Sequence, residues 1–223
     1  MNINNSSFDS DLAGFIDHTA LKPEVVMSDV KKLCDEATRF QFASVCVNPV
    51  WVPLCVKMLS DTQVKVCTVV GFPLGANTTQ VKCEETKQAV SDGAAEIDMV
   101  MNIGKFKDGD DDFVYEDIHE VVNSARPALV KVIIETCLLT DAEIAKASGI
   151  VKKAGAAFVK TSTGFNKAGA TESDVQLMRK VVGADFGVKA AGGIRDRETA
   201  LKMIKAGANR IGASASLVII GAE

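Results

Sequence analysis

Short apolar segments alternate with longer amphipathic segments along almost the whole chain. The short segments are rich in strand-forming apolar residues, which is typical of strands buried inside a parallel sheet. About eight of them recur at roughly even spacing. The predicted strands are residues 15–17, 44–47, 64–70, 96–101, 130–135, 157–161, 186–190 and 210–213.

The longer segments carry apolar residues at helical spacing, which predicts helices between the strands. Thr140 and Thr171 are suitable N-cap residues. Several segments end in glycine, as at Gly155 and Gly207, where the left-handed backbone of a helix C-terminus is expected. The predicted helices are residues 29–38, 79–91, 115–124, 141–154, 172–182 and 197–206.

Alternating strands and helices predict a parallel sheet with right-handed crossovers, and about eight repeats favour closure into a barrel. We therefore predict the α/β class and a single (β/α)8 TIM barrel, with residues 1–223 forming one domain. An open, doubly wound sheet is the alternative fold, but no G-x-G-x-x-G motif follows the first predicted strand. No linker or low-complexity segment divides the chain.

Composition narrows the possible partners. The net charge is −4 and no basic stripe stands out, so we expect no nucleic-acid partner. No apolar stretch is long enough to span a bilayer, and residues 1–11 are polar, so we expect neither a membrane partner nor a signal peptide. The 6 cysteines form no C-x-x-C pair, which favours reduced thiols and a cytoplasmic location.

Neither histidine has a partner at metal-ligand spacing, so no metal site is predicted. His18 is expected to be structural. The acidic segment 108–112 is expected to be a solvated loop rather than a metal site.

Polar residues and a glycine stand where the predicted strands end. In a TIM barrel the C-terminal ends of the strands form the active-site face. An apolar core does not need so many polar groups at equivalent places, so we predict a site there. The residues are Asp17, Asn48, Gly71, Asp98, Glu135, Lys160, Lys189 and Ser214.

Lys160 and Lys189 lie near the C-terminal ends of the sixth and seventh predicted strands. Neighbouring strands lie about 4.8 Å apart, so the two ammonium groups should repel each other and the pKa of at least one amine should fall. A neutral amine attacks carbonyl carbon, which predicts a Schiff-base enzyme. The alternative is that both lysines only extend to water. We expect Lys189→Leu to impair the chemical step rather than folding.

Two carboxylates are further candidates. Asp98 lies between apolar residues of a central strand, where it could relay protons as a general acid/base or form a structural ion pair. Asp17 could bind a substrate hydroxyl or cap the local turn. These alternatives stay open from the residues alone.

Glycine-rich segments follow the last two predicted strands and predict a phosphate site. Gly192 and Gly193 follow the seventh strand, and Gly212 and Ser214 mark the eighth. In this fold phosphate often binds between these two loops, where glycines allow backbone N–H groups to approach the anion. The alternative is an ordinary turn.

Ordered motifs along nearly the whole chain closely resemble the deoxyribose-phosphate aldolase family. They include Ile16-Asp17-His18-Thr19-Ala20-Leu21-Lys22-Pro23, Glu96-Ile97-Asp98-Met99-Val100, Lys131-Val132-Ile133-Ile134-Glu135-Thr136, Val159-Lys160-Thr161-Ser162-Thr163-Gly164-Phe165 and Val188-Lys189-Ala190-Ala191-Gly192-Gly193. The resemblance implies a TIM barrel without metal or organic cofactor. It implies reversible cleavage of 2-deoxy-D-ribose 5-phosphate to acetaldehyde and D-glyceraldehyde 3-phosphate.

The resemblance also implies residue roles. Lys160 would form the Schiff base, Lys189 would tune it, and Asp98 would be the acid/base of the relay. Asp17 and Thr163 would contact substrate. The phosphate would lie against Gly192, Gly193, Gly212 and Ser214. A homodimer is expected by family analogy.

Two departures from the family pattern change the expectations. Some members carry a phosphate-binding lysine where this chain has Phe165, so Arg195 or another cation is expected to meet the phosphate charge. Some members end in a tail with a terminal tyrosine, whereas Tyr115 is the only tyrosine here, so no contribution from such a tail is expected. Two other functions stay open: a sugar-phosphate isomerase with Asp98 or Glu135 as its base, and a non-catalytic barrel that binds a phosphorylated metabolite.

Overall fold

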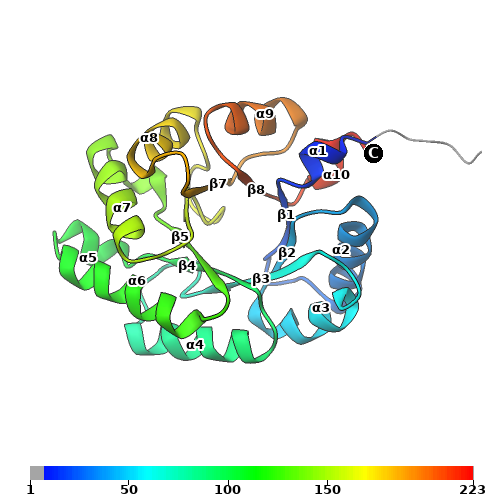
Figure 1. The fold of residues 1–223 in the computed structure, drawn as a ribbon, viewed down its shortest axis with the longest axis horizontal. Helices are drawn as coiled ribbons and strands as arrows, with labels where there is room; N and C mark the ends of the chain where they lie inside the picture. Colours follow the sequence, from blue (N-terminus) through cyan, green and yellow to red (C-terminus); the bar gives the residue numbers. More distant parts are fainter. Residues whose placement is uncertain (1–7, 223) are drawn as a thin grey trace, which may run out of the picture.

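In the computed structural model, which describes residues 8–222, the strands form a closed parallel barrel in the order β1 to β8 (Figure 1). The barrel closes where β1 pairs with β8 and His18 lies beside Ala213. A closed sheet leaves no strand edge unpaired. The predicted (β/α)8 barrel is therefore confirmed, and the open-sheet alternative is wrong.

All of the predicted strands are present, and six of the eight have shifted ends. The strand β1 continues three residues beyond its predicted end at Asp17, because His18 and Thr19 pair with β2 although neither is apolar. The strands are β1 (Ile16–Ala20), β2 (Ser44–Val47), β3 (Lys65–Val70), β4 (Glu96–Val100), β5 (Leu129–Ile133), β6 (Phe158–Lys160), β7 (Gly187–Ala191) and β8 (Arg210–Ala213).

Helices surround the barrel, and each predicted helix is present. Thr140 and Thr171 accept the expected N-cap hydrogen bonds, and Gly155 and Gly207 adopt positive φ after α7 and α9. The helices are α1 (Ser10–Ala13), α2 (Met27–Phe40), α3 (Val52–Leu59), α4 (Thr79–Ser91), α5 (Ile103–Lys107), α6 (Asp111–Ala125), α7 (Asp141–Lys153), α8 (Glu172–Val182), α9 (Arg197–Lys205) and α10 (Ser216–Ile220), with 3-10 turns η1 (Pro49–Trp51) and η2 (Thr136–Leu138).

The acidic segment 108–112 is only partly a loop, which corrects the prediction. Asp110 caps α6 by accepting a hydrogen bond from the N–H of Phe113, and Asp111 and Asp112 form the first turn of that helix. Acidic residues stabilise a helix N-terminus because they face its positive dipole end. The helix α3 was not predicted from sequence, because Pro49 and Pro53 are typical of a loop. Pro53 lies in the first turn of the helix, where proline is tolerated, and Pro49 lies in η1 before it.

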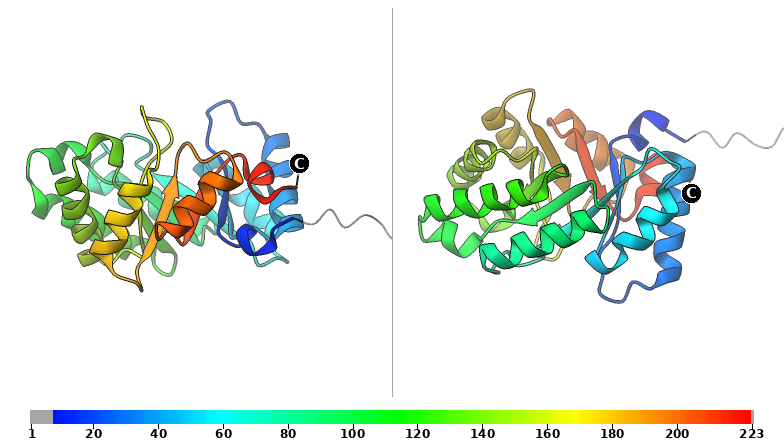
Figure 2. Two further views of the ribbon diagram at one scale, coloured as in Figure 1. Left: turned by 90° about the horizontal axis from the view of Figure 1, so that it is seen from above. Right: turned by 60° about the horizontal axis from the view of Figure 1, so that its bottom comes forward.

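The strands point their C-terminal ends toward one end of the barrel, and the loops that matter for function lie there. The left view of Figure 2 shows the loop between β1 and α2, in blue, and the loop between β6 and α8, in yellow, projecting at this end. The helices α1 and α10, near the two termini, lie side by side (Figure 1), and the N–H of Asp9 donates to the carbonyl of Ile220 at 3.0 Å.

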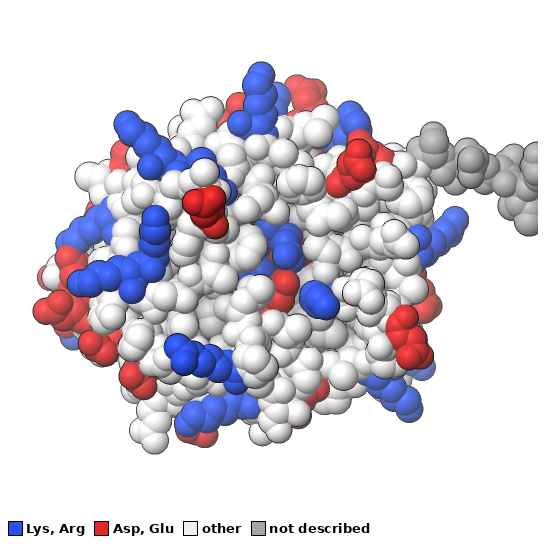
Figure 3. Space-filling view, in the orientation of Figure 1, with Lys and Arg blue, Asp and Glu red and all other residues white. Residues whose placement is uncertain are grey.

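Charged side chains of both signs are interspersed over the face that Figure 3 displays, with no single basic patch on it. Within residues 8–222, no helix combines the length and the apolar character that crossing a membrane requires.

Candidate active site

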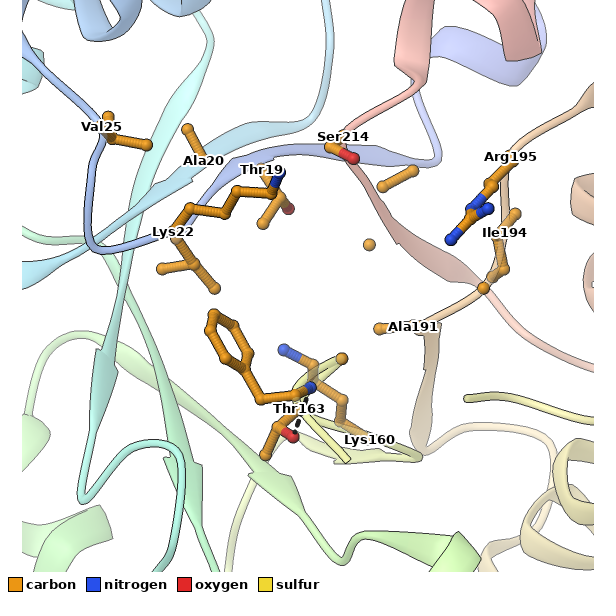
Figure 4. Close-up of a pocket in the computed structure, with 17 residues that line it drawn as sticks. Thr19, Ala20, Lys22, Val25, Lys160, Thr163, Ala191, Ile194, Arg195 and Ser214 are labelled. Carbon is orange, nitrogen blue, oxygen red and sulfur yellow. Dashed lines mark hydrogen bonds between the residues drawn. The ribbon is translucent and has the colours of Figure 1, made fainter. Parts of the chain in front are cut away.

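A cavity of about 470 Å³ opens at the C-terminal end of the barrel, among the loops that follow β1, β6, β7 and β8. Figure 4 shows the Lys160 amine directed into this cavity, with Thr163 beside it. The structure thus brings together most of the predicted site residues. Those that line the cavity are Lys160, Thr163, Gly192, Gly193, Gly212 and Ser214.

The charges that line the cavity are all positive. Lys22, Lys160 and Arg195 contribute to the lining, and no carboxylate from the described residues does. In Figure 4, Arg195 enters from the loop after β7, and Lys22 extends from the loop after β1. A cavity lined by cations in a protein of net charge −4 is suited to an anionic ligand.

Lys160 is the last residue of β6 and is paired in register with Lys189 of β7. Both amines donate to the same carboxylate oxygen, Oδ2 of Asp98, at 2.7 Å each. Lys160 reaches the cavity because it ends its strand, whereas Asp98 and Lys189 stand in the middle of theirs and lie beneath it. The predicted closeness of the three residues is confirmed.

Lys131, which was not singled out from the sequence, joins the three residues from below. It is fully buried on β5 and donates to Oδ1 of Asp98 at 2.9 Å. It also forms an ion pair with Glu96 at 2.6 Å, and Arg210 reaches the same Glu96 at 3.2 Å. The only signal available in the sequence was a lysine within an apolar strand, since the partners come from other strands.

Counting the ion pairs gives the buried network an excess of positive charge. Lys131, Lys160, Lys189 and Arg210 supply four cations, and Asp17, Glu96 and Asp98 supply three carboxylates. Loss of one proton from the network therefore leaves equal numbers of opposite charges. A buried cluster is most stable when its charges are paired in this way.

The same contacts shift the acidities of the network. Burial alone would raise the pKa of Asp98, but the ammonium groups of Lys131, Lys160 and Lys189 outweigh it and hold that pKa well below its ordinary value. Burial alone would lower the pKa of Lys189, but the carboxylates of Asp17 and Asp98 outweigh it and raise that pKa. The expected lowering of an amine pKa therefore does not apply to Lys189, because the carboxylates were not included in that reasoning.

Asp17 occupies a different place from the one expected. Its side chain is fully buried and does not line the cavity. Its Oδ1 accepts hydrogen bonds from Ser44 at 2.6 Å and Arg210 at 2.7 Å, and Oδ2 pairs with Lys189. Asp17 is the second residue of β1 rather than its end, so its side chain lies one layer below the cavity. From this position the Asp17 side chain neither reaches the cavity, where it could bind a substrate hydroxyl, nor caps a turn.

Other strand-end residues have structural roles. The side-chain amide of Asn48 donates to the carbonyl of Leu21 at 3.1 Å, and the N–H of Gly71 donates to Glu85 at 2.7 Å. His18 is buried between Ser216 and Glu36, each at 2.8 Å, as expected for a structural histidine.

The two glycines after β7 both have a left-handed backbone, with φ of +86° at Gly192 and +79° at Gly193. A Cβ added to Gly192 would lie 2.9 Å from the Cα of Gly169, so the loops after β6 and β7 approach closely there. Phe165, at the position of the family's lysine, packs edge-on against Phe72 at 5.2 Å between ring centroids. That side of the opening is therefore apolar.

Cys46, Cys67 and Asp98 place one potential metal-ligand atom each within 4.8 Å of one another. Lys131 already donates to Cys67 Sγ at 3.3 Å and to Asp98 at 2.9 Å. A metal cation there would have to displace an ammonium group from the only carboxylate of the set. The donor set therefore fits a metal poorly, and the absence of a metal cofactor stays a prediction.

The sequence comparisons define the class of protein to which this barrel belongs. The model of the DeoC/LacD family of aldolases matches residues 11–222, so the chain belongs to that family. Deoxyribose-phosphate aldolase from Bacillus cytotoxicus is 60% identical over 94% of this chain and 94% of its own length. Deoxyribose-phosphate aldolase from Clostridium tetani is 62% identical over 92% of this chain and 96% of its own length.

Solved structures agree with the family assignment. A structure described as a putative deoxyribose-phosphate aldolase from Coccidioides immitis superposes with a TM-score of 0.93 at 42% identity, covering 96% of this chain and 85% of its own. A tetrameric deoxyribose-phosphate aldolase from Aeropyrum pernix superposes with a TM-score of 0.90 at 33% identity, covering 96% and 91%. A dihydrodipicolinate synthase from Bacillus anthracis, at 16% identity, a TM-score of 0.67 and coverage of 93% and 72%, shares the fold alone.

Proposed function

We propose that this protein is a class I aldolase that reversibly cleaves 2-deoxy-D-ribose 5-phosphate into D-glyceraldehyde 3-phosphate and acetaldehyde through a Schiff base on Lys160. One observation carries the proposal: Lys160 alone among the lysines of the buried network lines the cavity, while its amine shares a carboxylate with Lys189. Relatives about 60% identical over nearly the whole chain are named for this activity.

The charge count gives Lys160 a route to the neutral amine that imine formation requires. When Lys160 loses its proton, Lys189 remains as a cationic partner of Asp98, so the carboxylate is not left unpaired. The raised pKa of Lys189 keeps that lysine protonated. The amine that faces substrate is therefore the one whose neutral form leaves Asp98 with a cationic partner.

The reaction then follows from the positions of these groups. The Lys160 amine attacks C1 of the open-chain sugar, and loss of water gives an iminium ion. As the C3 hydroxyl gives its proton through a water to the Asp98 carboxylate, which the protonated Lys189 holds in place, the C2–C3 bond breaks and its electrons enter the iminium. D-Glyceraldehyde 3-phosphate leaves, the enamine is protonated at C2, and hydrolysis releases acetaldehyde.

The other end of the substrate fits the rest of the cavity. We place its phosphate against Gly192, Gly193, Gly212 and Ser214, where backbone N–H groups and a hydroxyl can donate to it. Arg195 and Lys22 supply positive charge near that end, in place of the lysine that Phe165 replaces. Thr163 lies beside Lys160 and is the proposed contact to a substrate hydroxyl.

The two alternative functions have less support. The carboxylate of Glu135 is bonded to Thr163, and Asp98 lies beneath Lys160. Neither can therefore take a proton directly from a substrate carbon, as the base of an isomerase must, whereas a hydroxyl proton can be relayed. A non-catalytic binding barrel has no need for a buried network with an amine at the cavity.

Borohydride reduction tests the proposal directly. Incubation with acetaldehyde and borohydride is expected to add one reduced imine to Lys160, detected by peptide mass spectrometry. Lys160→Ala should lose both the adduct and the retro-aldol activity, whereas Lys167→Ala, a matched change of an exposed lysine in the same loop, should keep both. An active enzyme whose Lys160 is never modified would rule out imine chemistry.

We propose that residues 1–223 act as one domain, which the continuous barrel supports. We also propose that the protein self-associates as a homodimer or larger assembly, supported by the tetrameric relative from Aeropyrum pernix. Light scattering coupled to gel filtration gives the mass of the assembly, and a monomer at all concentrations would contradict it.

A further inference from the structure

Glu135 is a buried carboxylate that the proposed mechanism does not use. Its exposed fraction is 1%. Of the buried carboxylates within residues 8–222, only Glu135 has no lysine, arginine or histidine nitrogen within 4.0 Å; the others are Asp17, Glu96, Asp98 and Asp117. A buried carboxylate without a cation needs strong hydrogen-bond donors.

Thr163 supplies those donors. Its N–H donates to Oε1 of Glu135 at 3.2 Å, and its hydroxyl donates to Oε2 at 2.5 Å. Glu135 also has a left-handed backbone, with φ of +56°, which only a minority of non-glycine residues adopt. Backbone strain of this kind persists where the surrounding structure requires it, and it is frequent at functional sites.

The hydrogen bonds of the Thr163 hydroxyl can be counted. A hydroxyl has one proton to donate and two lone pairs. The proton goes to Glu135, and one lone pair accepts the N–H of Phe165 at 3.1 Å. One lone pair remains, and Thr163 lines the cavity. Because the Thr163 hydroxyl donates to Glu135, Thr163 can accept a hydrogen bond from a ligand but cannot donate one to it.

Thr163 stands between the two ends of the proposed substrate. It follows Lys160 by three residues, and the next residue, Gly164, lies against the phosphate loop, where a Cβ on Gly192 would come within 3.6 Å of its Cα. In the proposed mechanism the C3 hydroxyl gives its proton to the Asp98 relay. The C4 hydroxyl, between C3 and the phosphate, is then the one that needs an acceptor on the cavity wall.

We propose that Glu135 is a positioning residue that makes Thr163 a hydrogen-bond acceptor, so that the site selects substrates with a hydroxyl at C4. The inference rests on the proposed aldolase function and deepens it. A ligand that lacks this hydroxyl leaves the Thr163 lone pair unpaired, and sites built around a substrate hydroxyl reject analogues without it strongly.

The test compares two acceptors in the direction of carbon–carbon bond formation with acetaldehyde. D-Glyceraldehyde 3-phosphate carries the hydroxyl that becomes the C4 hydroxyl, and 3-oxopropyl phosphate lacks it. The wild-type protein is expected to favour the first by kcat/KM. Glu135→Gln should reduce that preference about tenfold, because the glutamine NH2 donates to Thr163 and turns the threonine proton toward the cavity. An equal loss with both acceptors, or an unchanged preference, overturns the inference.

A second pair of variants covers the case in which Glu135→Gln does not fold. Thr163→Ser keeps the hydroxyl and should keep the preference, whereas Thr163→Val should lose it. Identical preferences in the two variants overturn the inference. Reductive trapping of wild-type Lys160 by acetaldehyde, which has no hydroxyl, separates the two proposals: no adduct overturns the aldolase function, whereas an adduct with an unchanged preference overturns only the role of Glu135.

Discussion

At the scale of single residues, the site depends on which partner each buried charge has. Asp98 is shared by Lys131, Lys160 and Lys189, so removal of any one lysine leaves it partly compensated, but the three lysines differ in their other surroundings. Lys131 and Lys189 both also pair with Asp17, and Lys131 pairs with Glu96 as well. Lys160 alone among the three faces the cavity. The three lysines are therefore not equivalent in stability or in chemistry.

Lys189→Leu should impair folding as well as catalysis, which revises the expectation from sequence. The change removes a buried cation from two buried carboxylates, and such losses cost about 3–5 kcal/mol. For a chain of this length that corresponds to a fall in the melting temperature of roughly 10 °C. Calorimetry of the variant measures it. An unchanged melting temperature would show that Asp17 and Asp98 find other partners.

Lys22→Met should weaken the use of phosphorylated substrate more than that of free 2-deoxyribose. The side chain lines the cavity and is largely exposed, so its charge is worth up to about 1 kcal/mol, or about a fivefold rise in KM. The turnover number should change little, because the proposed role of Lys22 is to meet the phosphate charge and not to act on the reacting carbons. Lys167→Met, the same loss of charge outside the cavity lining, is the matched control. Equal effects of Lys22→Met on both substrates would exclude a role in phosphate binding.

At the scale of elements, the position of a residue along its strand decides the layer that its side chain joins. Glu96 and Asp98 are two residues apart on β4, so both point into the barrel, at different depths. Asp98 meets Lys160 and Lys189, while Glu96 meets Arg210. The loops at the strand ends matter as well. Those after β6 and β7 approach each other closely at Gly192, and this approach sets the shape of the proposed phosphate site.

Gly192→Ala should raise the KM for phosphorylated substrate and lower the melting temperature more than Gly193→Ala does. Both positions have positive φ, so both variants carry a backbone cost of roughly 1–2 kcal/mol. Only at Gly192 does the new Cβ also meet backbone, at 2.9 Å from Gly169, whereas nothing lies within 4 Å of it at Gly193. Kinetics and thermal melts of the pair test this. The opposite order would mean that the loops do not approach as described.

At the scale of the whole molecule, the barrel encloses one ionic network that joins six of its eight strands. The members come from β1, β4, β5, β6, β7 and β8. A strand cannot leave the barrel without separating buried charges from their partners. We therefore expect the molecule to unfold as one cooperative unit.

Acid should destabilise the fold in a defined range of pH. Burial alone would raise the pKa of Asp17 and of Asp98, but the surrounding cations outweigh burial and lower both below the ordinary value of 3.8. As the pH falls, the unfolded chain therefore binds protons at these carboxylates before the folded chain does. Their contribution to the free energy of unfolding is complete above about pH 5 and is lost as the pH falls through 4 and below. In that range each of the two carboxylates adds up to about 1.4 kcal/mol per pH unit to the slope of the free energy of unfolding against pH.

Denaturant unfolding between pH 2 and 7 measures this dependence. Asp98→Asn should have a shallower slope below pH 4 than the wild-type protein, because one linked proton is missing. A slope that is unchanged in the variant would show that Asp98 is not responsible.

The sequence by itself determined the barrel, because alternating apolar strands and capped helices depend on residues that are neighbours in the chain. It also placed Lys160 at a strand end beside Lys189, since strand order follows sequence order in this fold. The role proposed for Glu135 could not be foreseen, because its bonds to Thr163 join residues 28 apart. Only the tertiary structure decided the depth of Asp17 and the charges around Asp98, because these depend on the register and the partners that other strands contribute.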